Sequence, residues 1–248
     1  SSRPKPMELL YTALSGAKQA QTAMTIRANN LANVNTTGFR ADLERTAAYQ
    51  VDGYGHETRY MSQSEQAGTN FASGQLQQTG RTLDVAIQGE GYLAVQAPSG
   101  QEAYTRAGNI VVDGDGQAFI NGNPVLSDGG QLILPEYQQV TIGKDGTVSV
   151  IPLGGGAQIE AGQITLVKPE NTTMTKGQDG LLYLKNGAQA PVSDEVELVS
   201  GFLESSNVNA VTELVSSMAV NRQFELQIKM MKTADTLAQS GNKLISGS

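Results

Sequence analysis

The sequence has 248 residues, 39% of them hydrophobic, enough for one large domain or two modest ones with a buried core. It contains no cysteine, no tryptophan and one histidine, His56, which excludes disulfide scaffolds, thiolate zinc sites, cysteine nucleophiles and mechanisms with two imidazoles. The net charge of −7 argues against nucleic acid as a partner, because nucleic-acid-binding surfaces are usually basic. We see neither a long apolar run nor a cleavable leader, so we expect no membrane insertion.

Glycine, proline and acidic residues are concentrated in the middle of the chain. Residues 7–37 contain one glycine and no proline, and residues 202–240 contain neither. Six of the eight prolines lie from Pro98 to Pro191, and residues 51–200 carry seventeen acidic side chains against seven basic ones. Because glycine and proline mark turns, the sequence predicts a turn-rich middle between two helical ends.

The N-terminal segment, residues 7–37, is predicted to form a helix that packs on another helix. It is expected to end at residues 35–38, where Gly38 can adopt the left-handed conformation. Residues 1–6 are interpreted as a tag remnant or a native arm. The apolar stripe of this helix is narrow, and burying it would contribute only a few kcal/mol at roughly 25 cal/mol per Å², so the helix needs partners. Its predicted seam, with alternating steps of four and three, is Leu10, Leu14, Ala17, Gln21, Met24, Ala28 and Leu31.

Three asparagines in this segment need a reason, because each costs roughly 0.6 kcal/mol relative to alanine in a helix. They are Asn29, Asn30 and Asn33. An amide both donates and accepts hydrogen bonds, so these residues could bridge to neighbours and fix the register of packed helices. Alternatively the helix ends earlier, which would leave Asn33 and Asn35 in a turn.

The middle of the chain is predicted to be β-structure. Residues 38–75 are weakly periodic and are expected to be an extended or irregular linker. Residues 76–200 are expected to form a β-rich domain of antiparallel hairpins. Short alternating runs there are closed by Asp-Gly turns at 115–116, 145–146 and 179–180, and Gly89 and Gly91 indicate a tight turn or bulge.

Residues 201–248 are predicted to form a second helix, with Asn207 or Asn209 as its N-cap and Glu204 and Glu213 near its positive end. This helix has two apolar faces, whereas a surface helix of a globular protein needs only one. The sequence therefore predicts burial on more than one side, against the first helix and against neighbouring molecules. The first face consists of Val208, Val211, Val215, Met218, Leu226, Met230, Leu237 and Leu244, and the second of Val220, Phe224, Ile228 and Met231.

No catalytic, cofactor or metal site is predicted. The run Asp113-Gly-Asp115 fails as a calcium loop, since Ala118 and Pro124 occupy the positions of the required glycine and glutamate. Residues 154–156 lack the lysine and helix of a phosphate loop. Asp194, Glu195 and Glu197 are interpreted as a solvated face rather than a glycosidase pair, and His56 as a surface-loop residue.

Several long strings resemble the bacterial flagellar rod and hook axial family. They are residues 28–40 (ANNLANVNTTGFR), 83–92 (LDVAIQGEGY), 103–109 (AYTRAGN), 200–210 (SGFLESSNVNA) and 221–225 (NRQFE). Within that family, the short middle and the run RTLDVAIQGEGYLAVQ are most similar to proximal-rod subunits. A distal-rod subunit is the alternative.

The resemblance implies an α+β fold and a structural, non-enzymatic subunit of the flagellar rod in the periplasm. The terminal helices would pair in a coiled-coil-like inner domain, with the inserted β-rich domain outside. Implied partners are copies of itself, other rod proteins and the flagellar type III export apparatus. A wall-remodelling enzyme and an export chaperone remain alternatives; a zymogram and the content of purified basal bodies would separate them. The predicted assembly interface is Leu10, Leu14, Ala17, Met24, Ala28, Asn29, Asn30, Leu31, Asn33, Phe39, Val208, Val211, Val215, Met218, Phe224, Leu226, Met230 and Leu237.

Overall fold

The computed structural model describes residues 5–51 and 59–246, and it divides into two compact units. The helical unit consists of Ser1–Ala32, Asp42–Gly68 and Asn209–Ser248. The β-rich unit consists of Asn33–Ala41 and Thr69–Val208. His56, interpreted above as a loop residue, lies outside the described residues. The α+β fold class, with paired terminal helices and an inserted β-rich part, is confirmed.

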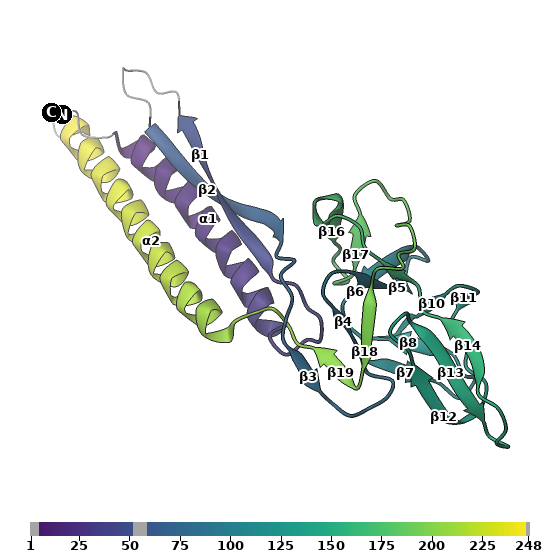
Figure 1. Cartoon of the computed structure of the whole chain (residues 1–248). Helices are drawn as coiled ribbons and strands as arrows, with labels where there is room; N and C mark the ends of the chain where they lie inside the picture. The colour runs from purple at the N-terminus through teal and green to yellow at the C-terminus, as the bar shows by residue number, and fades with distance from the viewer. Residues whose placement is uncertain (1–4, 52–58, 247–248) are drawn as a thin grey trace. The chain divides into compact units, whose positions relative to one another are not determined.

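The helical unit is built from two long helices and one pair of strands (Figure 1). Helix α1 (Pro6–Ala32) and helix α2 (Ala210–Ser246) run antiparallel and pack along their lengths. Strands β1 (Asp42–Val51) and β2 (Arg59–Thr69) pair with each other, and β1 contacts α1. Most of the described part of region 38–75 lies in these two strands, and the segment Asp42–Gly68 belongs to the helical unit. Its sequence did not indicate a hairpin because it lacks the strict apolar–polar alternation of a half-buried strand.

Helix α1 ends at Ala32, five residues before the predicted end, and a turn follows. Asn33 and Asn35 therefore lie in a turn, which was the second of the two interpretations. Helix α2 begins at Ala210 rather than in the region of residue 201, where a short strand lies instead. The Asn209 side chain accepts a hydrogen bond from the Thr212 amide at 3.1 Å, so Asn209 rather than Asn207 is the N-cap.

The face of α1 that packs against α2 differs from the predicted seam. Of that seam only Ala17 is buried, whereas Leu14, Gln21 and Ala28 are exposed. The prediction was wrong because it followed the large apolar residues, whereas close packing of two helices selects small ones. The α1 residues with buried side chains or backbone are Ala13, Gly16, Ala17, Gln19, Ala20, Ala23, Ile26 and Asn30.

The apolar core between the two helices is small. Ala20, Ala23 and Val220 are buried together, with Met24 and Phe224 half-buried against them. The second apolar face of α2 is thus the one directed at α1. Gly16 fits against the amide of Gln227, and a Cβ at this position would overlap that amide. A helix pair with so little buried apolar surface gains little stability within one chain.

The β-rich unit contains short antiparallel strands in several small sheets (Figure 1). Its central sheet has the order β15-β5-β6-β17-β16, and a three-stranded sheet has the order β12-β13-β14. The remaining pairings are β7-β8-β9, β4-β18, β3-β19 and β10-β11. The bounds are β3 Leu76–Gln78, β4 Val85–Gln88, β5 Tyr92–Gln96, β6 Glu102–Thr105, β7 Ile110–Val112, β8 Ala118–Ile120, β9 Asn123–Pro124, β10 Leu126–Ser127, β11 Gly130–Gln131, β12 Tyr137–Ile142, β13 Thr147–Pro152, β14 Ile159–Gln163, β15 Leu166–Val167, β16 Met174–Lys176, β17 Leu182–Leu184, β18 Glu197–Ser200 and β19 Phe202–Glu204.

All three predicted Asp-Gly hairpins are confirmed. They join β7 to β8, β12 to β13 and β16 to β17, and the glycine of each has a positive φ between 80° and 86°. Alternating residues of these and neighbouring strands fill one large apolar core that includes Ile87, Leu93, Ile110, Val148 and Leu198. Burial of this core supplies most of the hydrophobic stabilisation of the β-rich unit.

The buried hydroxyl of Tyr104 makes the stability of the β-rich unit depend on pH in the alkaline range. It donates to the Glu102 carboxylate at 2.8 Å and accepts from the Ala190 amide at 2.7 Å. Burial, reinforced by Glu102, raises the pKa of Tyr104 to about 12. The folded state therefore favours the protonated phenol, so this stability is complete below the unfolded pKa of about 10 and is lost as pH rises to about 12.

We expect the urea midpoint of the β-rich unit to fall between about pH 10 and about pH 12, as measured by circular dichroism. Tyr104→Phe should reduce that slope without abolishing it, because burial and Asp179 also raise the pKa of Tyr183 to about 12. An unchanged slope in Tyr104→Phe would contradict the assignment to Tyr104.

Candidate functional site

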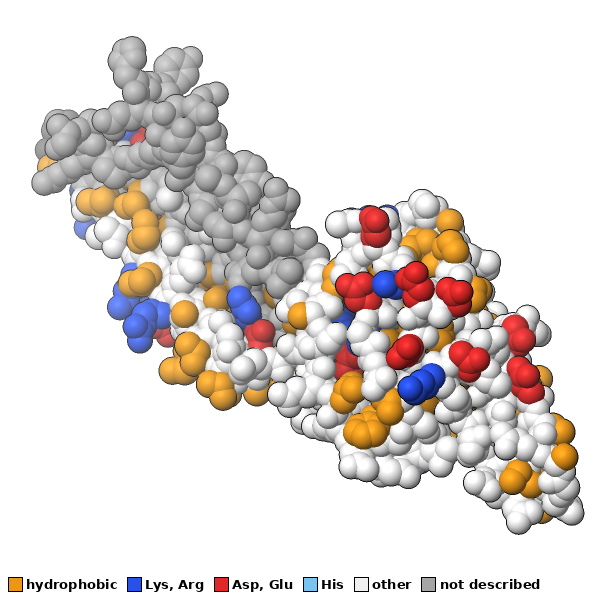
Figure 2. All heavy atoms as spheres, in the orientation of Figure 1, with side chains coloured by type: hydrophobic (Ala, Val, Ile, Leu, Met, Phe, Trp, Pro, Cys, Tyr) orange, Lys and Arg blue, Asp and Glu red, His pale blue; other side chains and the backbone are white. Residues whose placement is uncertain are grey.

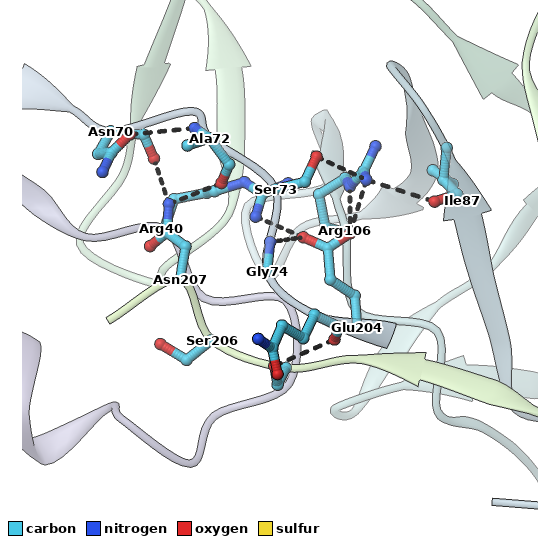
Figure 3. Close-up of polar contacts among 12 residues, drawn as sticks. Arg40, Asn70, Ala72, Ser73, Gly74, Ile87, Arg106, Glu204, Ser206 and Asn207 are labelled. Carbon is cyan, nitrogen blue, oxygen red and sulfur yellow. Dashed lines mark hydrogen bonds and ion pairs between the residues drawn. The ribbon is translucent and has the colours of Figure 1, made fainter. Parts of the chain in front are cut away.

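A buried polar cluster, which we name the junction, holds the ends of the β-rich unit's chain segments together (Figure 3). It consists of the side chains of Arg40, Arg106, Glu204 and Asn207 and the backbone of residues 70–74. Except for Arg106, which lies between β6 and β7, these residues come from three separate segments: one before β1, one after β2, and one that runs from the end of β19 to the start of α2. The first and third segments each precede an element of the helical unit, and the second follows one.

Glu204 is the centre of the junction and is fully buried, at 0% exposure. One carboxylate oxygen accepts the Gly74 amide at 3.0 Å and also pairs with Arg40. The other oxygen accepts Arg106 Nε at 2.8 Å. Gly74 lies so close to the backbone of Ser205 that a Cβ there would overlap the Ser205 carbonyl oxygen. Glycine at position 74 therefore allows the two segments to meet.

Asn207 uses every polar atom of its side chain within the junction (Figure 3). Its Oδ1 accepts the Ala41 amide at 2.7 Å. Its Nδ2 donates to the carbonyl oxygens of Asn70 at 2.9 Å and Ala72 at 2.8 Å. Its own backbone amide donates to the Phe39 carbonyl at 3.1 Å. One residue thus bonds to both other segments.

The two arginines of the junction share a single carboxylate and are each 3% exposed. Arg106 also donates to the carbonyl oxygens of Gly89 and Gly91, both at 2.8 Å, and both of these glycines have a positive φ, at 84° and 125°. Burial lowers the pKa of the Arg40 guanidinium below its ordinary value; Arg106 also lowers it, and Glu204 opposes both effects. A cavity of about 250 Å³ beside the arginines is also lined by Glu90 and Glu170, so both signs of charge face it.

The strings that resemble the family contain Arg40, Arg106, Glu204 and Asn207, but the sequence did not predict that these residues meet. Asn207 and Glu204 were considered only as helix-terminal residues. The available signal was the presence of a charged residue within otherwise small or apolar strings, as with Arg106 in AYTRAGN and Glu204 in SGFLESSN. Charged residues are seldom buried unless paired, so such placement suggests a buried ion pair.

A second candidate site is the side of α2 away from α1, which we name the outer stripe. Val211 and Met218 are each 70% exposed, and Val215, Leu226 and Leu237 are also exposed. Arg222 and Lys229 occupy intervening positions at helical spacing. Figure 2 shows hydrophobic and basic side chains along this edge of the helical unit, and acidic side chains over the β-rich unit. Apart from the buried Val208 and the half-buried Met230, the first apolar face predicted for α2 is therefore uncovered within one chain.

The other predicted interface residues divide by exposure. Ala17, Asn30 and Val208 are buried within this chain, and Val208 precedes α2. Asn30 bonds to the backbone of Asp42 through both amide atoms, at 2.8 and 3.0 Å, which fixes β1 against α1. These three residues act inside the chain. Half-buried are Leu10, Met24, Leu31, Asn33, Phe39, Phe224 and Met230, and exposed are Leu14, Ala28 and Asn29.

The acidic residues tested as chemistry lie apart from the junction. Asp113 caps its hairpin turn by accepting the amides of Asp115 and Gln117. Asp194, Glu195 and Glu197 are exposed, as predicted. Among the described residues, no group of three or more His, Cys, Asp or Glu is placed to hold a metal ion. Within residues 5–51 and 59–246, neither helix has the length and hydropathy that crossing a membrane requires.

Comparison with known proteins matches three models of flagellar proteins to this chain. "Flagella basal body rod protein" matches residues 10–40, "Flagellar hook protein FlgE/F/G D1 domain" matches 86–150, and "Flagellar basal body rod FlgEFG protein C-terminal" matches 199–244. These ranges correspond to α1 with the following turn, the first half of the β-rich unit, and β18 to α2.

Relatives match along nearly the whole chain. The flagellar basal-body rod proteins FlgF of Escherichia coli K12 and of Salmonella typhimurium LT2 are each 39% identical over 96% of this chain and 98% of their own length. FlgG of Bacillus subtilis 168 is 34% identical over 93% of this chain and 96% of its own length. The chain therefore belongs to the family of flagellar basal-body rod proteins, and it is similar to the FlgF members of that family.

Proposed function

We propose that this protein is a non-enzymatic structural subunit of the proximal rod of the flagellar basal body. It assembles with copies of itself and with other rod proteins through its helical unit. The observation that carries the assembly mechanism is the outer stripe of α2, a row of apolar side chains at helical spacing that no part of the described chain covers. Covering an exposed valine or methionine contributes roughly 1.5–3 kcal/mol, so a few such contacts stabilise a subunit interface.

The proposed interface is drawn from the exposed and half-buried residues of the predicted set. On α2 it comprises the outer stripe with the half-buried Met230; on α1 it comprises Leu10, Leu14, Ala28 and Leu31. Asn29 lies nearby and donates to the Asp42 carboxylate at 3.1 Å. In this proposal the helical unit forms the inner part of the rod and the acidic β-rich unit the outer part. The flagellar type III export apparatus would deliver the subunit.

A distal-rod subunit is the second candidate, favoured by the 34% identity to Bacillus subtilis FlgG. Basal bodies from cells that lack this protein distinguish the two. If this protein is a proximal-rod subunit, distal rod proteins cannot be added without it, so the isolated structures should contain neither a complete proximal rod nor a distal rod. Basal bodies that retain a rod lacking only its distal part would support the second candidate.

We expect Met218→Asp to abolish swimming and to be absent from purified basal bodies, because assembly would bury an unpaired carboxylate. Since Met218 is 70% exposed, the free chain should fold as before. The control is Asn221→Asp, which adds the same charge at an exposed position away from the outer stripe and should swim normally. Normal incorporation of Met218→Asp would contradict the proposed interface.

A further inference from the structure

The chain passes between its two units four times, between residues 32 and 33, 41 and 42, 68 and 69, and 208 and 209. All four passages are ends of three short segments of the β-rich unit, 33–41, 69–74 and 204–208. We propose that Glu204 and Asn207 form a clamp that ties these segments together, so that mechanical load reaches the β-rich unit through all of them at once. This proposal rests on the proposed function, because a rod subunit transmits torque.

The clamp connects each pair of segments directly. Asn207 joins the third segment to the first through Ala41 and to the second through Asn70 and Ala72. The first and second segments are joined by the Asn70 amide, which donates to the Ala41 carbonyl at 2.6 Å. Each segment is therefore bonded to both of the others, so that one segment cannot separate without breaking its bonds to the other two.

Glu204 provides a second, charged layer of bonds among the same three segments. It pairs with Arg40 of the first segment and accepts the Gly74 amide of the second. Its backbone carbonyl accepts the Gly38 amide at 2.8 Å. Arg106 anchors this carboxylate to the body of the β-rich unit, through Gly89, Gly91 and, at 3.4 Å, the Ile87 carbonyl of β4. Force on any segment is therefore distributed to the others and to the sheet edge.

Directional bonds fit this role better than apolar packing does. A hydrogen bond weakens steeply once its geometry is lost, whereas apolar contacts permit sliding. Bonds between segments that are loaded together must break together, which raises the barrier to forced separation. Forced unfolding is governed by the unfolding rate, so we expect such a clamp to raise resistance to load in addition to its effect on equilibrium stability.

Hydrogen exchange on the purified full-length chain tests the clamp locally. In Asn207→Ala the Ala41 amide loses its acceptor, and its exchange should accelerate by about tenfold or more. Amides of the central sheet, such as Ala94 bonded to Thr165, should keep their wild-type rates. The matched control is Val150→Ala, which truncates a buried side chain of β13 far along the chain from the junction. In Val150→Ala the amides of the central sheet should exchange faster, whereas the Ala41 amide should keep its acceptor and its wild-type rate.

Swimming under load tests the function. Cells with Asn207→Ala or Asn207→Asp should incorporate the subunit and swim at wild-type speed in dilute buffer, but lose motility in a viscous medium. Asn207→Asp keeps an acceptor for Ala41 and loses both donated bonds, so it isolates the link to the second segment. Val150→Ala should follow the wild type at every viscosity, because loss of core stability alone does not weaken the clamp.

The outcomes separate the clamp from the proposed function. Load sensitivity in both Asn207 variants but not in Val150→Ala supports the clamp. A wild-type viscosity profile, or equal sensitivity in all three, overturns it and leaves the proposed function intact. Failure of only the Asn207 variants to enter basal bodies also overturns it, because these residues would then act in assembly. Absence of the wild-type chain from basal bodies refutes the proposed function itself.

Discussion

Replacing Glu204 with alanine should lower the free energy of unfolding of the β-rich unit by about 3–5 kcal/mol, the usual cost of removing one partner of a buried ion pair. The variant leaves Arg40 and Arg106, each 3% exposed, buried without their shared carboxylate. The Gly74 amide also loses its acceptor. Charge burial, rather than loss of packing, makes this the largest single-residue effect that we expect.

Urea denaturation followed by circular dichroism measures this effect, and Glu197→Ala, at an exposed position of β18, is the control. Glu197→Ala should change the free energy of unfolding by less than about 0.5 kcal/mol. Adding Arg40→Met to Glu204→Ala should recover part of the loss, because one uncompensated charge is removed. A loss below about 1 kcal/mol for Glu204→Ala would show that the carboxylate is not the counter-ion of both arginines.

In the free monomer, amides of residues 10–31 and 211–238 should exchange about 100-fold faster, or more, than amides of β5 and β6. The apolar cluster between the two helices is small, with Ala20, Ala23 and Val220 buried together, whereas the β-rich unit has a large core. Helices without extensive packing are marginal in water, so the helical unit should open locally without unfolding the β-rich unit. Assembly should then supply the missing contacts through the outer stripe.

Hydrogen exchange with mass spectrometry, performed on dilute monomer and again on assembled protein, measures this difference. Protection of both helices should rise on assembly, whereas protection of β5 and β6 should stay constant. Leu226→Asp, in the outer stripe, should leave monomer protection unchanged and prevent the rise. Strong protection of both helices in the dilute monomer would refute coupled folding and assembly.

Local sequence signals predicted the elements well and the packing faces poorly. The Asp-Gly turns at residues 115–116, 145–146 and 179–180 were found because their backbone conformation depends on the glycine itself. A helix cap at Asn207 or Asn209 was also predicted, because a cap depends on the side chain of the residue itself, and the structure decides for Asn209. The buried face of α1 was missed, because which stripe is covered depends on the partner's shape, and the fit of Gln227 against Gly16 is invisible in either segment alone.

The junction could not be assembled from the sequence for the same reason. Arg40, Arg106 and Glu204 are separated by 66 and 98 residues, and no period relates them. Asn207 and Asn209 are only two residues apart, yet one ties three segments and the other caps a helix. Long-range pairing depends on where the chain returns, and local propensity contains no information about that.

By itself, the sequence determined the helical ends, the hairpin-rich acidic middle, the family and the excess of apolar surface on α2, because these depend on composition, periodicity and short strings. Only the tertiary structure decided which face of α2 is left uncovered, that the hairpin β1–β2 belongs with the helices, and that one carboxylate and one amide join the three segments. The physical reason is that burial and hydrogen bonding are properties of pairs of groups, and the sequence specifies such pairs only through the fold.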